Sequence, residues 1–368
     1  MAPSSQEGIP PTSCKLTALF GVCFAMLASA CGASSSTTDS SVHGAVGEPC
    51  NSSGLFAADS VWNACLPADT PIDPGSGGMV EALDREVGRE VTAGTGPYVQ
   101  TDSYSTPLYV VRAHQPVVRV ALDDSHAPWR RSLQRAFRRV PIPGRARPAA
   151  GSDAHMTVWQ PSRDRLWEFW QARKEHGGWH ASWGGAMKHV SRSPGYFDES
   201  SWPRLSRTYW GATATSLPVV GGTMLLKELR AGEIQHALAL SLPAPRAGWF
   251  AWPAQRTDGT GPSEAIPEGA RLRLDPAVNL DDMHLPWMTL MMARAAQRYG
   301  MIVRDQTHAA IGFYAQDPVR AKRDPYNGPN GFFGGQSPTQ LLARFPWESL
   351  EVVRMKLCRE GSGRCSQG

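Results

Sequence analysis

Two short segments in the middle of the chain, 153–160 and 166–171, alternate between apolar and other side chains. A period of two predicts β-strands, because successive side chains of a strand point to opposite faces of a sheet. The residues between them, Pro161 to Asp164, favour a turn. The two segments are therefore predicted to form an antiparallel hairpin, in which Thr157 lies opposite Glu168.

The predicted register gives the hairpin two chemically different faces. One face is apolar and suits a core; it comprises Met156, Val158, Trp167 and Phe169. The other face combines an imidazole, a hydroxyl, a carboxylate and two indoles; it comprises His155, Thr157, Glu168, Trp159 and Trp170. Polar groups beside exposed aromatic rings suit a cleft that binds sugars.

Similar patterns predict the other elements. Helical patterns are predicted at 79–87, 129–139, 225–230 and 287–299. Extended segments are predicted at 106–112, 117–122, 177–183, 233–242 and 301–305, with two more around 252–256 and 271–274. Many short strands and few helices predict a mainly β fold, an antiparallel β-sandwich or jelly roll with a few peripheral helices. An α+β layered fold is the alternative.

Composition narrows the function classes. The chain has 368 residues, of which 41% are hydrophobic and 19% charged, so one large β-rich domain is expected over residues 50–368. The formal net charge of +4 is too small to indicate nucleic acid, and no nucleic-acid-binding motif is present in the sequence. We expect a monomer whose partner is a polysaccharide or a cell-envelope glycan.

The N-terminal 30 residues have the pattern of an export signal. Lys15 precedes an apolar run, Leu16 to Ala30, that is too short to span a bilayer. The end of this run, before Cys31, resembles the bacterial lipobox, although Leu27 lies one position further from the cysteine than usual. We expect a lipid on Cys31 as the only membrane anchor, a disordered tether at 31–49, and a location outside a bacterial cell; simple secretion is the alternative.

The cysteines agree with an oxidising compartment. Once the signal and the lipidated residue are set aside, an even number remains: Cys50, Cys65, Cys358 and Cys365. Three pairings are possible, and proximity in sequence favours Cys50 with Cys65 and Cys358 with Cys365. Such bonds would fasten the two ends of the folded domain.

A set of short motifs resembles a broad, mostly uncharacterised family of exported bacterial proteins. The motifs are Asp59-x-x-Trp-Asn63, Asp153-x-His155, Glu168, Leu217-Pro218, Gly232-x-Ile-x-His-Ala-Leu238, Trp252-Pro-Ala254, Arg271-x-Arg-Leu274 and Tyr299-Gly-Met with Asp305. The similarity runs roughly from Asp59 to Trp347. The chain departs from the family pattern before Leu217, where threonines replace an acidic segment. The resemblance implies one exported domain that acts on polysaccharide, but it supplies no mechanism.

Residue chemistry predicts how a glycosidic bond would be cleaved. A hydrolase needs a proton donor and a second carboxylate. Glu168 is the predicted acid, because aromatic neighbours are expected to raise its pKa. Asp153, which could orient His155, is its predicted partner, and Asp305 is the alternative carboxylate.

A polysaccharide lyase would use a base and a cation instead. His155 or His180 would abstract the proton beside a uronic carboxylate, and Arg256 or Arg273 would neutralise that carboxylate. Thr157, Trp159 and Trp170 are predicted to contact the sugar in either case.

Two other function classes remain open. A non-catalytic carbohydrate-binding or envelope-binding lipoprotein would need the aromatic face alone. A metal enzyme would use Asp153, His155, Glu168 and His236 as ligands, although no short ligand spacing supports it and we predict no metal or cofactor. Each candidate also has a purely structural interpretation. Glu168 would pair with an arginine, and His155 and His236 would form hydrogen bonds inside the sheet.

Overall fold

A computed structural model describes residues 54–123, 128–198, 201, 210–319 and 321–361. Every described residue belongs to a single compact unit within His43–Gly368. The predicted export signal, tether and lipidated Cys31 therefore lie outside the described residues. Within the described ranges, no helix is both long and apolar enough to cross a bilayer.

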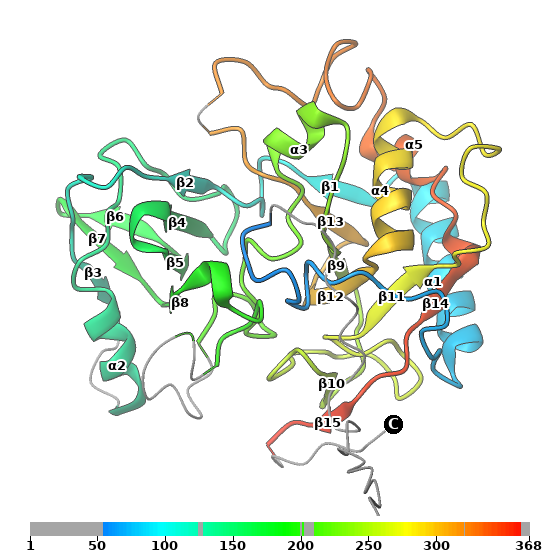
Figure 1. Ribbon diagram of the computed structural model, residues 1–368, viewed down its shortest axis with the longest axis horizontal. Helices are drawn as coiled ribbons and strands as arrows, with labels where there is room; N and C mark the ends of the chain where they lie inside the picture. Colours follow the sequence, from blue (N-terminus) through cyan, green and yellow to red (C-terminus); the bar gives the residue numbers. More distant parts are fainter. Residues whose placement is uncertain (1–53, 124–127, 199–200, 202–209, 320, 362–368) are drawn as a thin grey trace, which may run out of the picture. The chain divides into compact units, whose positions relative to one another are not determined.

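A six-stranded mixed sheet carries the larger hydrophobic core. Its strands, in spatial order, are β1 (Tyr98–Gln100), β13 (Gly312–Tyr314), β9 (Leu238–Leu242), β12 (Met301–Gln306), β11 (Arg271–Leu274) and β14 (Leu350–Val352) (Figure 1). The pairs β1–β13 and β9–β12 are parallel, and the other pairs are antiparallel. Strand β9 is buried at every residue, which explains its nearly continuous apolar sequence.

Three helices pack beside this sheet: α1 (Ser76–Ala93), α4 (Trp287–Arg298) and α5 (Pro338–Leu342) (Figure 1). Helix α4 presents a methionine and alanine face to the core. Gly300 follows the helix with a φ of 81°, a conformation that favours glycine. A Cβ atom at Gly300 would also lie 2.7 Å from the carbonyl oxygen of Leu272, so glycine lets β12 begin directly against β11.

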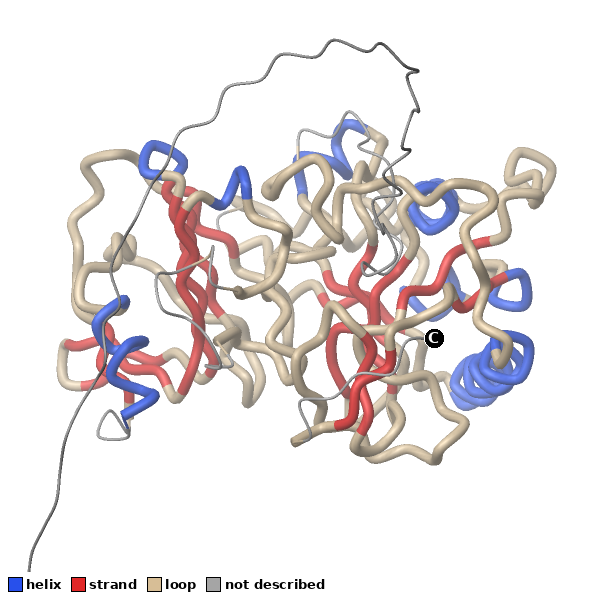
Figure 2. The backbone as a smooth tube through the Cα atoms, turned by 60° about the horizontal axis from the view of Figure 1, so that its bottom comes forward, coloured by secondary structure: helices blue, strands red, loops and turns tan. Residues whose placement is uncertain are grey.

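The remaining strands form three smaller sheets. A four-stranded sheet has the order β2 (Leu108–Val110), β4 (Met156–Gln160), β5 (Arg165–Trp170), β8 (Trp183–Lys188). A three-stranded sheet has the order β3 (Val120–Leu122), β7 (Gly178–Ala181), β6 (Arg173–Glu175), and β10 (Trp249–Ala251) pairs with β15 (Leu357–Arg359). The helices α2 (Pro128–Ala136) and α3 (Leu226–Ala231) and short 3₁₀ turns at 161–163, 190–192 and 347–349 complete the described elements. Figure 2 shows how much of the chain lies in loops between these short strands.

The predicted mainly β fold with a few peripheral helices is confirmed. The sheets are mixed instead of purely antiparallel, because β1–β13, β9–β12, β2–β4 and β3–β7 pair in parallel through long connections. Neither Cys65 nor Cys358 is a free thiol. Their predicted partners, Cys50 and Cys365, lie outside the described residues, so the two predicted pairings stay predictions.

Candidate functional site

The predicted hairpin forms with the predicted register. Strands β4 and β5 pair antiparallel, and Thr157 lies opposite Glu168. A 3₁₀ turn joins them and ends at Asp164, which has a positive φ of 49°. Next to the paired strands, the N–H of Gln171, which follows β5, donates to the carbonyl oxygen of Asp153, which precedes β4, over 2.7 Å. The backbone before β4 is therefore held against the end of β5.

One cleft of about 1330 Å³ opens at this end of the hairpin. Five predicted site residues line it: Asp153, His155, Trp170, Arg256 and Asp305. The lining also includes aromatic and charged groups that the sequence did not single out for a site: Tyr98, Tyr104, Arg130, Trp183, Asp258, His308 and Tyr314. The cleft thus brings together a histidine, carboxylates, an arginine and indoles.

The surroundings of His155 fix which of its ring nitrogens carries a proton. Its Nε2 lies 2.9 Å from the carbonyl oxygen of Ala212, which can only accept, so Nε2 carries the proton. Nδ1 then has a free lone pair, but this atom is inaccessible to solvent and has no hydrogen-bond partner among the described residues. Burial lowers the pKa of His155, although the charge of Asp153 opposes this effect. The imidazole is therefore neutral at neutral pH, and its small exposed edge lines the cleft.

Asp153 and Trp170 form the adjoining wall of the cleft. The indole Nε1 of Trp170 donates to Asp153 Oδ1 over 3.1 Å. This bond orients the carboxylate beside His155 and leaves both side chains partly exposed in the cleft. The three residues lie together as predicted, but no hydrogen bond joins Asp153 to His155 in the described structure, so the predicted orientation of the imidazole by Asp153 is not observed.

Glu168 does not reach the cleft lining. Its side chain is fully buried, and its two oxygens accept the backbone N–H groups of Ala212 and Val219 over 2.7 and 2.8 Å. Burial raises the pKa of Glu168 to about 7, against the lowering effect of these bonds and of the Arg304 charge. The predicted shift is therefore present, but both oxygens are occupied. The geometry therefore gives Glu168 a structural role: it holds the 212–219 loop and does not protonate a leaving group.

Four other predicted residues also lie outside the cleft lining. Thr157 is fully buried, and Trp159 packs against the core of the smaller sheets. His180 approaches Asp123 at 3.9 Å. Arg273 donates from Nε to Glu351 Oε2 over 2.7 Å and from Nη1 to the carbonyl oxygens of Pro67 and Ala68.

The predicted metal ligands do not come together, because His236 forms a separate buried pair. Its Nε2 lies 3.1 Å from Glu228 Oε2, and its Nδ1 lies 2.8 Å from the carbonyl oxygen of Ala237. Burial alone would lower the pKa of His236, but the charge and hydrogen bond of Glu228 raise it overall. Burial would likewise raise the pKa of Glu228, but His236 and the N–H of Leu225 lower it.

We expect Glu228→Gln to lower the free energy of unfolding by about 1–3 kcal/mol, most strongly between the ordinary pKa values of 4.5 and 6.5. The pKa of His236 is raised in the folded protein. The stabilisation from His236 is therefore complete at a pH below its pKa in the unfolded chain, and it is lost as the pH rises through its pKa in the folded protein. The pKa of Glu228 is lowered in the folded protein. The stabilisation from Glu228 is therefore present at a pH above its pKa in the unfolded chain, and it is lost as the pH falls through its pKa in the folded protein. Urea denaturation across this range measures the difference, and a difference independent of pH would contradict the ion pair.

Three carboxylates, Asp258, Glu268 and Asp305, also meet beside the cleft. Burial, followed by the charges of the other two carboxylates, raises the pKa of Glu268 to about 9, and burial and nearby carboxylates raise that of Asp305 to about 7. Sequence reasoning found Asp305 alone. Glu268 and Asp258 lie in loops without a periodic pattern, and their spacing from Asp305 gives no signal.

Comparison with known protein families, curated proteins and solved structures finds no match to this chain. The resemblance to exported bacterial proteins therefore stays a prediction, and the functional argument rests on the residues of the cleft.

Proposed function

We propose that the protein is a polysaccharide-cleaving enzyme whose catalytic centre is the cleft at the end of the β4–β5 hairpin. The observation that carries this proposal is the meeting of a neutral imidazole, a guanidinium and an indole in one cleft, on His155, Arg256 and Trp170. These groups supply a base, a partner for an acidic sugar and a surface for stacking on a sugar ring.

The arrangement favours elimination over hydrolysis. The predicted hydrolytic acid, Glu168, uses both oxygens on backbone N–H groups, whereas His155 and Arg256 both line the cleft. Arg256 donates from Nη2 to the carbonyl oxygen of Thr213 over 2.7 Å, which fixes the guanidinium beside the loop that His155 also contacts. A fixed guanidinium is suited to pair with the carboxylate of a uronic acid.

The proposed reaction breaks the C–H bond beside the uronate carboxylate and the C–O bond to the neighbouring sugar. His155 Nδ1, which the structure leaves covered and which must turn into the cleft when substrate binds, takes the proton. The electron pair forms a carbon–carbon double bond, and the glycosidic oxygen leaves and gains a proton. Tyr104 is the proposed donor of that proton, because its hydroxyl lies 3.4 Å from Ser152 Oγ, next to Asp153. Arg256 stabilises the negative charge that builds on the carboxylate before the C–O bond breaks.

The test is a panel of polyuronates and neutral polysaccharides, assayed for new reducing ends and for the ultraviolet absorbance of unsaturated products. We expect both signals with polyuronates and neither with neutral glycans. Reducing ends without absorbance would assign the cleavage to hydrolysis and overturn the elimination mechanism. Silence on every substrate, with binding retained, would favour a carbohydrate-binding protein.

Arg256→Lys tests substrate recognition. Lysine keeps the charge but loses the planar pair of donors, so we expect the Michaelis constant for a polyuronate to rise by about 10–100-fold. Arg273→Lys is the matched control, because Arg273 is paired with Glu351 away from the cleft. Equal Michaelis constants for the two variants would remove Arg256 from the recognition of substrate.

We also propose that the enzyme acts outside the cell, held by lipid on Cys31. Polymeric substrates do not need to enter the cell to be cleaved, and the sequence of residues 1–30 has the pattern of an export signal.

A further inference from the structure

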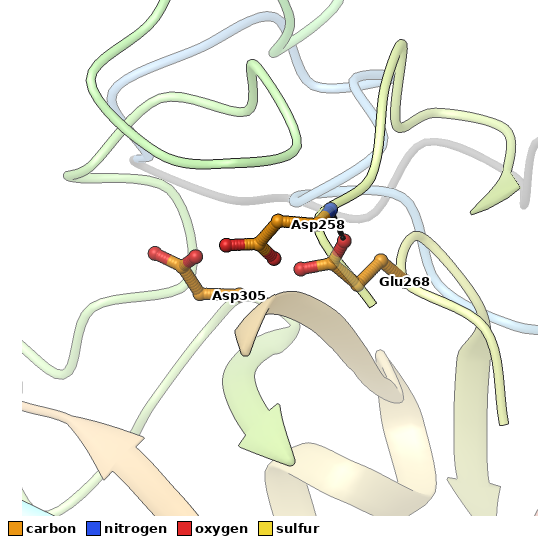
Figure 3. Close-up of side chains that lie close together, drawn as sticks. All are labelled: Asp258, Glu268 and Asp305. Atoms are coloured by element: carbon orange, nitrogen blue, oxygen red, sulfur yellow. Dashed lines mark hydrogen bonds between the residues drawn. The ribbon is translucent and has the colours of Figure 1, made fainter. Parts of the chain in front are cut away.

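A cluster of three carboxylates lies at one side of the cleft, and its members come from three separate segments. Asp258 follows β10, Glu268 precedes β11, and Asp305 lies in β12. One oxygen from each lies within 4.8 Å of the others, and Figure 3 shows the three side chains converging. Asp258 is exposed, Asp305 is half-buried and Glu268 is fully buried, so the cluster leads from the cleft into the protein.

Glu268 carries a buried oxygen without a partner. Its Oε2 accepts the backbone N–H of Asp258 over 3.0 Å. Its Oε1 is inaccessible to solvent and has no hydrogen-bond partner among the described residues. Figure 3 shows this carboxylate directed toward Asp258 and Asp305. A buried carboxylate oxygen aimed at two further carboxylates requires a positive ion or a proton, because an uncompensated buried charge is strongly unfavourable.

The nearby basic side chains do not neutralise the cluster by direct contact. Arg256 directs its Nη2 to the carbonyl oxygens of Thr213 and Gly211, and within the described residues no ion pair joins it to the three carboxylates. Burial raises the pKa of Asp258 overall; the charge of His308 opposes this rise, but no ion pair joins the two side chains in the described structure.

The backbone holds Glu268 firmly against the strand that carries Asp305. The N–H of Ala251 donates to the carbonyl oxygen of Glu268 over 2.7 Å, and the N–H of Gly269 donates to that of Val303 over 2.7 Å. Gly269 has a φ of 82°, and a Cβ atom there would lie 1.7 Å from the carbonyl oxygen of Ala251. The carboxylates are therefore positioned before any ligand arrives.

We propose that Asp258, Glu268 and Asp305 bind one hard divalent cation of the calcium type at the side of the cleft. All three donors are oxygens, which suit calcium, magnesium or manganese and not the softer metals. Two ligands on opposite sides of Ca²⁺ lie about 4.6–5.2 Å apart, whereas those of Mg²⁺ lie about 4.0–4.2 Å apart. The three oxygens lie within 4.8 Å of one another, a spacing that the coordination sphere of Ca²⁺ can span.

The cation would complement Arg256, which lines the same cleft. A calcium ion with three protein carboxylates keeps coordination positions for water or for a carboxylate of the substrate. This use of the ion rests on the proposed function, but the binding of the ion does not.

The experiment measures Ca²⁺ binding without substrate. The full mature chain is freed of metal with a chelator, desalted and titrated with calcium chloride by calorimetry, and its melting temperature is followed with and without Ca²⁺. We expect one ion per chain, a melting temperature that rises with Ca²⁺, and weaker binding of Mg²⁺. Glu268→Gln and Asp258→Asn should each weaken Ca²⁺ binding by about 100-fold or more, since even outer-shell changes cost about 10–100-fold.

Glu264→Gln is the matched control, because Glu264 is exposed in the same loop and bonds to Ser263. It should bind Ca²⁺ as the wild type does. Asp258 is exposed, so its variant is expected to fold even if a change at the buried Glu268 is not tolerated. Absence of binding by the wild type, or equal binding by wild type and Asp258→Asn, would overturn the proposal. Either result leaves the cleavage assay unaffected, so the two proposals fail separately.

Discussion

Glu168→Ala is expected to lower the free energy of unfolding by about 3–5 kcal/mol and the melting temperature by roughly 10 °C. The change removes the oxygens that accept the N–H groups of Ala212 and Val219, and it leaves these two donors buried without partners. A cavity in a closely packed sheet adds to the loss. Thermal and urea denaturation measure both quantities.

Thr157→Val is the matched control for this variant. Thr157 lies opposite Glu168 on the paired strand and is equally buried, but its hydroxyl has no hydrogen-bond partner among the described residues. Valine removes that hydroxyl at nearly the same volume, so the stability is expected to stay level or to rise. An unchanged melting temperature in Glu168→Ala, together with lost cleavage, would return Glu168 to the role of general acid.

His155→Gln is expected to lower the rate of polyuronate cleavage by about 10²–10⁴-fold with little change in melting temperature. The glutamine amide can still donate to the carbonyl oxygen of Ala212, so the bond that holds the loop is kept. The amide has no nitrogen that can take a proton near neutral pH, so the base is lost. Initial rates at saturating substrate measure the effect.

His236→Gln separates loss of a base from loss of a buried histidine. His236 is as buried as His155, but it is paired with Glu228 and does not line the cleft. This variant should melt at a lower temperature and retain the rate of the wild type per folded molecule. A rate for His155→Gln within a few-fold of the wild type would remove His155 from the chemistry.

The register of the hairpin was predictable because two local signals agree. The alternation in 153–160 and 166–171 specifies which side chains share a face, and the turn at Pro161–Arg163 fixes the pairing. The shared position of Asp153 and His155 beside the hairpin was predictable for the same reason, since both residues lie just before β4. The periodicity of a strand does not predict which other segment of the chain covers each of its faces. Glu168 lies beneath backbone N–H groups of residues more than 40 positions later, and backbone donors are the same in every sequence.

Strand ends were harder to predict where backbone geometry interrupts a regular pattern. The predicted strand at 177–183 is divided between β7 and β8, which belong to different sheets and are separated at Ser182. The predicted strand at 233–242 forms only from Leu238, because His236 turns to pair with Glu228. The carboxylate cluster depends on contacts between loops, for which a single sequence carries no periodic signal.

The decisive measurement is the ultraviolet absorbance of a polyuronate solution after addition of the purified mature chain, with His155→Gln in parallel. If the cleft performs the proposed elimination, absorbance rises with the wild type and stays flat with the variant, while both proteins melt at similar temperatures. A wild type that produces no unsaturated ends from any polyuronate, or a variant that produces them equally fast, would contradict the assignment of this cleft as a site of polysaccharide cleavage by elimination.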